Sequence, residues 1–132
     1  MLKANYYTEP TELDQLIFEK LVPANHYLRK VKVAIDFARF RKQVRDCYDD
    51  EMGRQAEDPA RMIKLEYLEI QYNLSDREVI ADAQVNVAFR FFLDLSLESA
   101  LPVPRLLSQF RTRLGVDRHE TILNDLVAQA RA

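Results

Sequence analysis

The apolar residues of this sequence recur every three or four positions, the spacing that places them on one face of an α-helix. The pattern predicts a first helix over 11–21, a second around 28–35, a third after Asp36, and two more over 104–114 and from 117 to the end. These stripes consist of Leu13, Leu16, Ile17, Leu21, Leu28, Val31, Ile35, Phe37, Phe40, Val44, Cys47 and Tyr48, and later of Leu107, Phe110, Leu114, Ile122, Leu123, Leu126, Val127 and Ala130.

The middle of the chain carries the clearest helix starts. Asp58 followed by Pro59 opens a helix, because the Asp side chain accepts a free amide and Pro at the first position loses no hydrogen bond. Ser75 begins an S-x-x-E capping box, and Asn86 is a plausible third cap. Between the first two caps the apolar residues point in all directions, which indicates a buried central helix over about residues 59–73.

The composition favours an all-α fold in a single domain. Only two glycines occur in 132 residues, and no alternating strand pattern of useful length is present. The single Cys47 excludes an internal disulfide, as expected of a cytoplasmic protein. No apolar run is long enough to span a membrane.

The charge is unevenly distributed, although the net charge is only −2. Residues 28–45 are strongly basic, and residues 46–58 are strongly acidic. A basic segment in an acidic protein can form a polyanion-binding surface if it folds onto one side. The basic residues of the segment are Arg29, Lys30, Lys32, Arg39, Arg41, Lys42 and Arg45.

No catalytic constellation is visible in the sequence. His26 and His119 stand in no metal-ligand spacing; His26 is expected to make a local structural contact, and His119 to belong to a capping box that starts at Asp117. Glu66 and Glu69, on a helix with Lys64, are interpreted as helix-surface charges. The chain is therefore expected to be no enzyme by itself and to need no metal or cofactor.

One predicted helix, over 104–114, combines a buried stripe with a polar opposite face. A helix that reads DNA needs side chains for base edges, such as Arg for guanine and Gln for adenine, and further side chains for phosphates. The first group is Arg105, Ser108, Gln109 and Thr112, and the second is Arg111 and Arg113 with the basic segment, including Arg29 and Lys30. Arg77 and Arg90 are further candidate contacts. Together with the helices from Ser75 and Asn86, this helix would complete a helix-turn-helix-like array.

Three stretches resemble the N-terminal domain of bacterial insertion-sequence transposases of the DDE class. They are LVPANHYLRKVKVAIDFARFRKQV from Leu21, DPARMIKLEYLEIQYNLSDREVIADAQVNVAFRFFLDL from Asp58, and PRLLSQFRTRLG from Pro104. The matching elements are Val-Pro-x-x-His-x-Leu-Arg, Asp-Pro, Leu-Ser-Asp-Arg-Glu, Ala-Phe-Arg-x-Phe-Leu and Phe-Arg-x-Arg-Leu-Gly. The chain departs from the family at residues 102–106, where Pro-Val-Pro-Arg-Leu replaces a polar Pro-Asp-His-Ser-Thr run.

The resemblance implies a helical domain that recognises the double-stranded DNA of transposon ends, the terminal inverted repeats, and that can contribute to a homodimer. It also implies an arm and first helix over 1–22, the DNA-binding domain over 23–116, and a linker helix over 117–132. The catalytic carboxylates and their divalent metal ions would belong to a further domain. The alternative is a helical protein-interaction or dimerisation module, with the apolar stripe of the last helix as its surface.

Overall fold

The computed structural model describes residues 8–43 and 58–131, and within these ranges the chain is helical and contains no strand. The predicted all-α class is confirmed. The helices are α1 (Glu12–Leu21), α2 (Tyr27–Ala34), α3 (Arg39–Gln43), α5 (Pro59–Tyr72), α6 (Asp76–Val85), α7 (Val87–Leu93), α8 (Arg105–Leu114) and α9 (Val116–Arg131).

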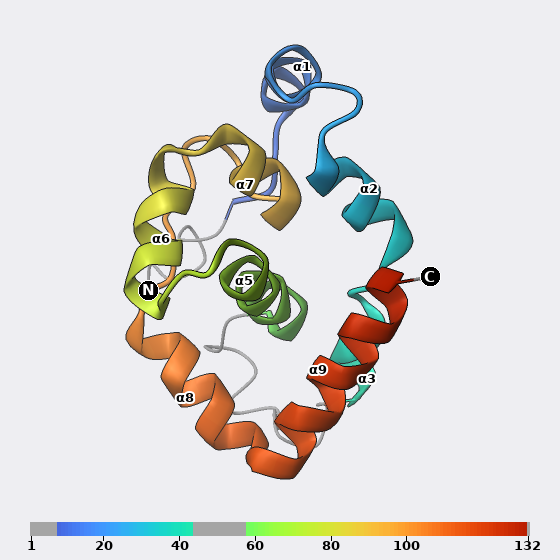
Figure 1. Cartoon of the computed structure of the whole chain (residues 1–132). Coiled ribbons are helices and arrows are strands. Elements are labelled where there is room, and N and C mark those ends of the chain that lie inside the picture. Colours follow the sequence, from blue (N-terminus) through green and yellow to red (C-terminus); the bar gives the residue numbers. More distant parts are fainter. Residues whose placement is uncertain (1–7, 44–57, 132) are drawn as a thin grey trace.

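Helix α5 is the centre of the fold, as its all-round apolar pattern predicted. Figure 1 shows it end-on, with α2, α3, α6, α7, α8 and α9 arranged around it. Every side chain from Met62 to Leu68 is buried, whereas Ile70 and Tyr72 in the last turn are exposed. The other helices bury apolar side chains against α5 or against each other. Helix α1 does so through Phe18, whereas Leu13, Leu16 and Leu21 of its predicted apolar stripe are exposed.

The predicted caps position the three middle helices. The carboxylate of Asp58 accepts a hydrogen bond from the Ala60 amide at 3.0 Å. The Ser75 hydroxyl accepts from the Glu78 amide at 3.1 Å, while the Glu78 carboxylate accepts from the Ser75 amide at 2.9 Å, which completes the capping box. The side chain of Asn86 caps α7 in the same way. These local signals explain why the chain turns where it does.

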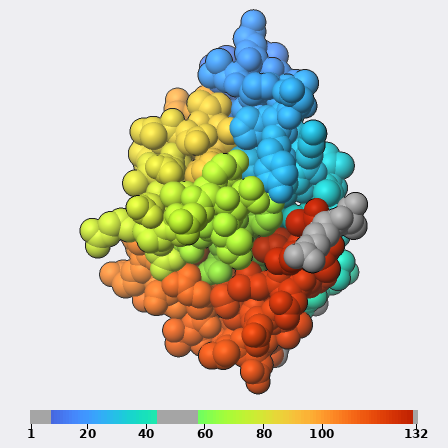
Figure 2. All heavy atoms as spheres, in the orientation of Figure 1, coloured from blue at the N-terminus to red at the C-terminus, as the bar shows by residue number. Residues whose placement is uncertain are grey.

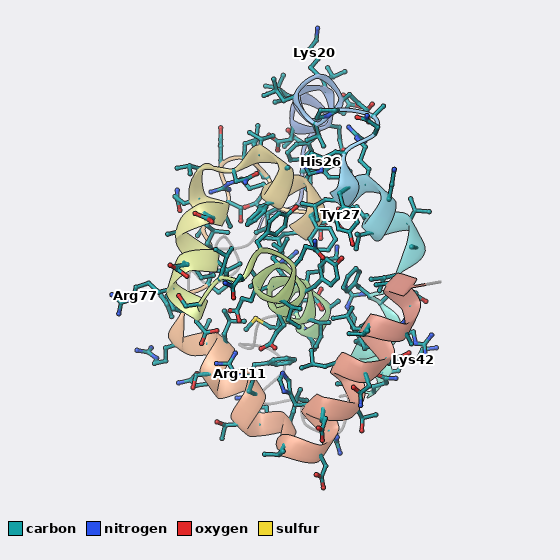
Figure 3. The ribbon with its side chains drawn as sticks, viewed as in Figure 1. Lys20, His26, Tyr27, Lys42, Arg77 and Arg111 are labelled. Carbon is teal, nitrogen blue, oxygen red and sulfur yellow. The ribbon has the colours of Figure 1, made fainter. Side chains whose placement is uncertain are left out.

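His26 has the local structural role that was predicted. Its Nδ1 accepts a hydrogen bond from the Leu28 amide at 3.0 Å and so caps α2. Figure 3 shows His26 at the start of α2, close to the end of α1.

Two predicted N-caps, Asp36 and Asp117, are wrong. Helix α3 begins at Arg39, because the backbone around Asp36 first makes turn hydrogen bonds. Phe37 and Phe40 are core residues, as predicted. Val44, Cys47, Tyr48 and the acidic stretch 49–57 lie outside the described residues. Helix α9 begins at Val116, directly after Gly115, so Asp117 lies in the first turn and is no N-cap. A helix start needs no side-chain cap where the preceding turn already supplies its hydrogen bonds.

Helix α9 is packed onto the rest of the domain. Ile122 and Leu126 are each 1% exposed and belong to the same core as α5. Of the apolar stripe proposed as an interaction surface, the chain itself therefore covers Ile122 and Leu126, whereas Val127 is 40% exposed. The role of α9 as a linker stays a prediction.

Candidate nucleic-acid interface

Helix α8 has the two faces that the sequence predicted. Leu107, Phe110 and Leu114 are buried against the core. The opposite face is exposed along the length of the helix and consists of Arg105, Ser108, Gln109 and Thr112. No carboxylate occurs anywhere in α8, although the chain as a whole is acidic. The exposed row can therefore approach a polyanion without repulsion from its own helix.

Helix α8 begins one residue later than predicted and ends where predicted. Pro104 is the residue before the helix rather than its first residue, and it makes no side-chain cap. Gly115 ends the helix with a φ of 85°, a conformation that residues with a Cβ rarely adopt. The sharp turn at Gly115 lets α9 follow at once and pack beside α8.

Arg111 fastens α8 to two other helices. Its guanidinium donates to Glu66 Oε2 of α5 at 2.9 Å and to both carboxylate oxygens of Asp76 in α6, at 3.1 and 2.7 Å. The hydrogen bonds from Arg111 hold the pKa of Asp76 below its ordinary value, and the two carboxylates raise the pKa of Arg111. Arg111 was predicted to hold a phosphate; in the structure it fixes the position of α8 instead (Figure 3).

The interpretation of Glu66 and Glu69 as surface charges is wrong. Glu66 is only 4% exposed, and its second oxygen lies 2.8 Å from His119 Nε2 on α9. His119 therefore binds a buried carboxylate rather than capping its own helix. Burial, followed by the nearby Asp76 carboxylate, raises the pKa of Glu69 to about 9, so that this side chain is protonated at neutral pH. These groups join α5, α6, α8 and α9 in one polar cluster beneath the exposed face of α8.

Lys64, also interpreted as a surface charge, is 8% exposed. Its ammonium lies 3.0 Å from Asp94, which also binds Lys32 at 2.6 Å. Burial lowers the pKa of Lys64, and the Asp94 carboxylate opposes that effect. This charged group ties α2 and α5 to the end of α7.

Arg77 lies next to the contact between Arg111 and Asp76 that holds α8 in place. It follows Asp76 in the first turn of α6, and its side chain is exposed. In Figure 3 it projects away from the body on the side of the molecule that α8 occupies. Arg77 can therefore extend the exposed surface of α8, as the sequence suggested.

Arg90 and Arg29 occupy structural positions. Arg90 is 4% exposed and donates to the carbonyls of Ala83, Ser96 and Ser99. Arg29 donates to the carbonyls of Phe18, Val22 and Pro23 at the end of α1 and lies over the ring of Phe91. Both guanidinium groups donate to main-chain carbonyls at helix ends and in the connections that follow. The fold uses both for main-chain contacts, so we leave them out of the interface.

The basic segment does not form one continuous surface. Lys32 pairs with Asp94, Arg39 with Asp125 and Arg41 with Asp58. Lys30 and Lys42 are exposed and have no partner in the described part of the chain, whereas Arg45 lies outside it. Lys30 is on α2, which lies across α5 from α8 (Figure 1), so it cannot belong to the surface formed by Arg77 and α8. The local excess of positive charge is thus largely neutralised by acids from distant parts of the sequence.

The remaining predicted contact, Arg113, is half-buried on the shoulder of α8 and interacts with other groups of the domain. Among residues 8–43 and 58–131, no group of three His, Cys, Asp or Glu side chains is arranged to hold a metal ion. In the same ranges, no helix combines the length and the apolar character that crossing a bilayer requires.

Comparison with known proteins gives one result. A family model described as Transposase domain (DUF772) matches residues 16–113, from within α1 to the penultimate residue of α8. Neither the curated proteins nor the solved structures contain a match.

Proposed function

Because the chain belongs to the Transposase domain (DUF772) family, whose model covers residues 16–113, we propose that it is a non-catalytic DNA-binding domain that recognises the terminal inverted repeats of a transposon. Helix α8 is the recognition element in this proposal. Catalysis, with its carboxylates and divalent metal ions, belongs to another domain of the transposase.

One observation supports the proposal above all others: α8 exposes a row of base-reading residue types and carries no acid. Arg105 can pair with a guanine and Gln109 with an adenine, while Ser108 and Thr112 can contact bases or phosphates. Arg77 provides a phosphate contact beside them. The row is rigid, because Leu107 and Phe110 anchor the helix from below and Arg111 fixes it from the side.

The proposal does not depend on a strict helix-turn-helix. Helices α7 and α8 are joined by residues 94–104, a longer connection than the three- to four-residue turn of that motif. Helix α6 contacts α8 and α7, so the three form a helical array in which only α8 presents a suitable row. A helix that lies in the major groove needs support from its neighbours but not a particular turn.

Fluorescence anisotropy on duplexes that carry the transposon ends, with shuffled duplexes of equal length for comparison, tests the proposal. Loss of a bidentate base contact costs about 1–3 kcal/mol, so Arg105→Ala and Gln109→Ala should each weaken binding to the end sequence by about 5- to 150-fold. Arg77→Ala should weaken binding to both duplexes and reduce the dependence of log K on log salt concentration by about one.

Lys20→Ala is the matched control, since it removes an exposed positive charge from α1, far from α8 (Figure 3). Its affinity should equal that of the wild type. Absence of binding to every duplex at low salt would refute the proposal, as would equal losses for Arg105→Ala and Lys20→Ala.

A protein-interaction function is favoured by a different observation. The stripe on α9 is buried at Ile122 and Leu126, but three leucines of α1 are more than half exposed: Leu13, Leu16 and Leu21. This apolar surface is distinct from the polar face of α8.

A further inference from the structure

Helix α1 exposes more leucine than its role in the fold requires. It forms the tip of the molecule (Figures 1 and 2) and packs on α7 through its inward face, where Phe18 meets Phe91 edge-to-face at 5.7 Å. Its outward side chains Leu13 and Leu16 are 65% and 61% exposed. Isolated exposed leucines are ordinary, but these two are adjacent on one helix face.

These leucines form a single ridge together with the half-buried Ile17 and the exposed Lys20. Leu13, Leu16, Ile17 and Lys20 follow the i, i+3, i+4, i+7 spacing and so lie along one side of α1. Lys20 is exposed at the carboxyl end of the ridge and has no partner in the described part of the chain. Figure 3 shows the Lys20 side chain pointing outward from α1, away from the body of the molecule. At the amino end, Glu12 is exposed beside Leu13.

We infer that this ridge of α1 packs antiparallel against the α1 ridge of a second copy of the chain. A two-fold axis between positions 16 and 17 places Leu16 and Ile17 of the two copies against each other. The same axis places Lys20 over Leu13 of the second copy, with its ammonium next to Glu12 there. An isologous contact of this kind needs a self-complementary ridge, and this ridge has one.

The charges select the antiparallel arrangement. In a parallel pair, Lys20 would face Lys20. In the antiparallel pair each Lys20 instead lies next to Glu12 of the other copy, and the helix dipoles also oppose each other favourably. Lys20 can cover Leu13 with its aliphatic part while its ammonium reaches the acid.

The contact is small. Two short helices bury less than the roughly 1,200 Å² of a standard stable interface, so the dimer is weak and forms only at high concentration. The inference is independent of DNA recognition, because α1 and α8 lie at opposite ends of the molecule (Figure 1). At the low chain concentrations of a DNA titration, the pair is not populated.

Sedimentation velocity on the whole chain, from about 10 μM to 1 mM, tests the inference in the range where small interfaces associate. The sedimentation coefficient of the wild type should rise with concentration. Lys20→Glu and Leu16→Asp should abolish the rise, and the exchange Glu12→Lys with Lys20→Glu should restore it, because it recreates both ion pairs. Lys30→Glu on α2 is the matched control and should behave as the wild type.

All four positions are exposed, so circular dichroism should show unchanged helix content and melting. A wild type that remains monomeric at about 1 mM would overturn the inference. So would a Lys20→Glu variant that associates as the wild type does, or a double exchange that fails to restore association.

Discussion

Glu69 makes a sharp prediction about how the stability of this domain depends on pH. Its carboxyl is half-buried beside Asp76, one of its oxygens is fully buried and has no hydrogen-bond partner among the residues that the structure describes, and its pKa is raised from 4.5 to about 9. Between these two pH values the folded chain keeps a proton that the unfolded chain has released. The free energy of unfolding must therefore fall as pH rises through this window.

The size of this change in the free energy of unfolding follows from the rise in the pKa of Glu69. For a fully desolvated group, a pKa rise from 4.5 to about 9 corresponds to about 6 kcal/mol. Solvent screening around a half-buried side chain reduces this, and we expect a loss of about 2 kcal/mol between pH 5 and pH 8. Glu69→Gln has nearly the same shape and no charge. Its amide can also donate to the Asp76 carboxylate, so the variant should be about 2 kcal/mol more stable than the wild type at pH 8 and almost equal to it at pH 5.

Urea denaturation followed by circular dichroism at pH 5, 6.5 and 8 measures these differences. Glu120→Gln is the control, because Glu120 is an exposed glutamate on α9, and it should show no such pH dependence. A Glu69→Gln variant whose stability differs from the wild type by the same amount at all three pH values would refute the reasoning, since its effect would then not come from the proton.

Two arginines that hold helices together, the half-buried Arg111 and the buried Arg90, give further predictions. Arg111→Met should destabilise the domain by about 3 kcal/mol, because it leaves the buried carboxylate of Glu66 with His119 as its remaining partner. The DNA affinity per folded molecule should change far less than in Arg105→Ala. An Arg111→Lys variant as stable as the wild type would contradict the structural role of the guanidinium. Arg90→Met should cost about 3 kcal/mol in the same urea titration, because it removes the buried donor to the carbonyls of Ala83, Ser96 and Ser99. A loss of DNA affinity at wild-type stability would return Arg90 to the interface.

Much of the fold was predictable because its signals are local. A cap such as that at Ser75 involves residues three positions apart, and the apolar faces repeat within two turns. The central position of α5 followed from apolar residues on all its sides. The opposite faces of α8 followed from the same pattern, so Arg105, Ser108, Gln109 and Thr112 were placed correctly as exposed residues.

The errors concern charges whose partners are distant in the sequence. Arg111 binds Glu66 and Asp76, which precede it by 45 and 35 positions. The spacing of residues along the chain gives no sign of such distant ion pairs. A buried glutamate on α5 therefore cannot be told from a solvated one in the sequence. Arg29 and Arg90 were misplaced for the same reason: they serve main-chain carbonyls, which have no sequence signature. The one available hint was that Glu66 and Lys64 interrupt the most enclosed helix, where charges need partners.

The contacts of α9 bear on where this domain can be divided. The Asp36 amide donates to Gln129 at 3.0 Å, and Arg39 pairs with Asp125 at 2.9 Å, so the last helix joins the segment between α2 and α3 and closes the ring around α5. The family match stops at residue 113, yet the cooperative folding unit includes Ile122 and Leu126. Removal of α9 at the family boundary would open the core along one side. The contact between Asp36 and Gln129 joins residues more than 90 positions apart, so forming it carries a high loop-entropy cost. We therefore expect the folded domain to open first where α9 meets α2.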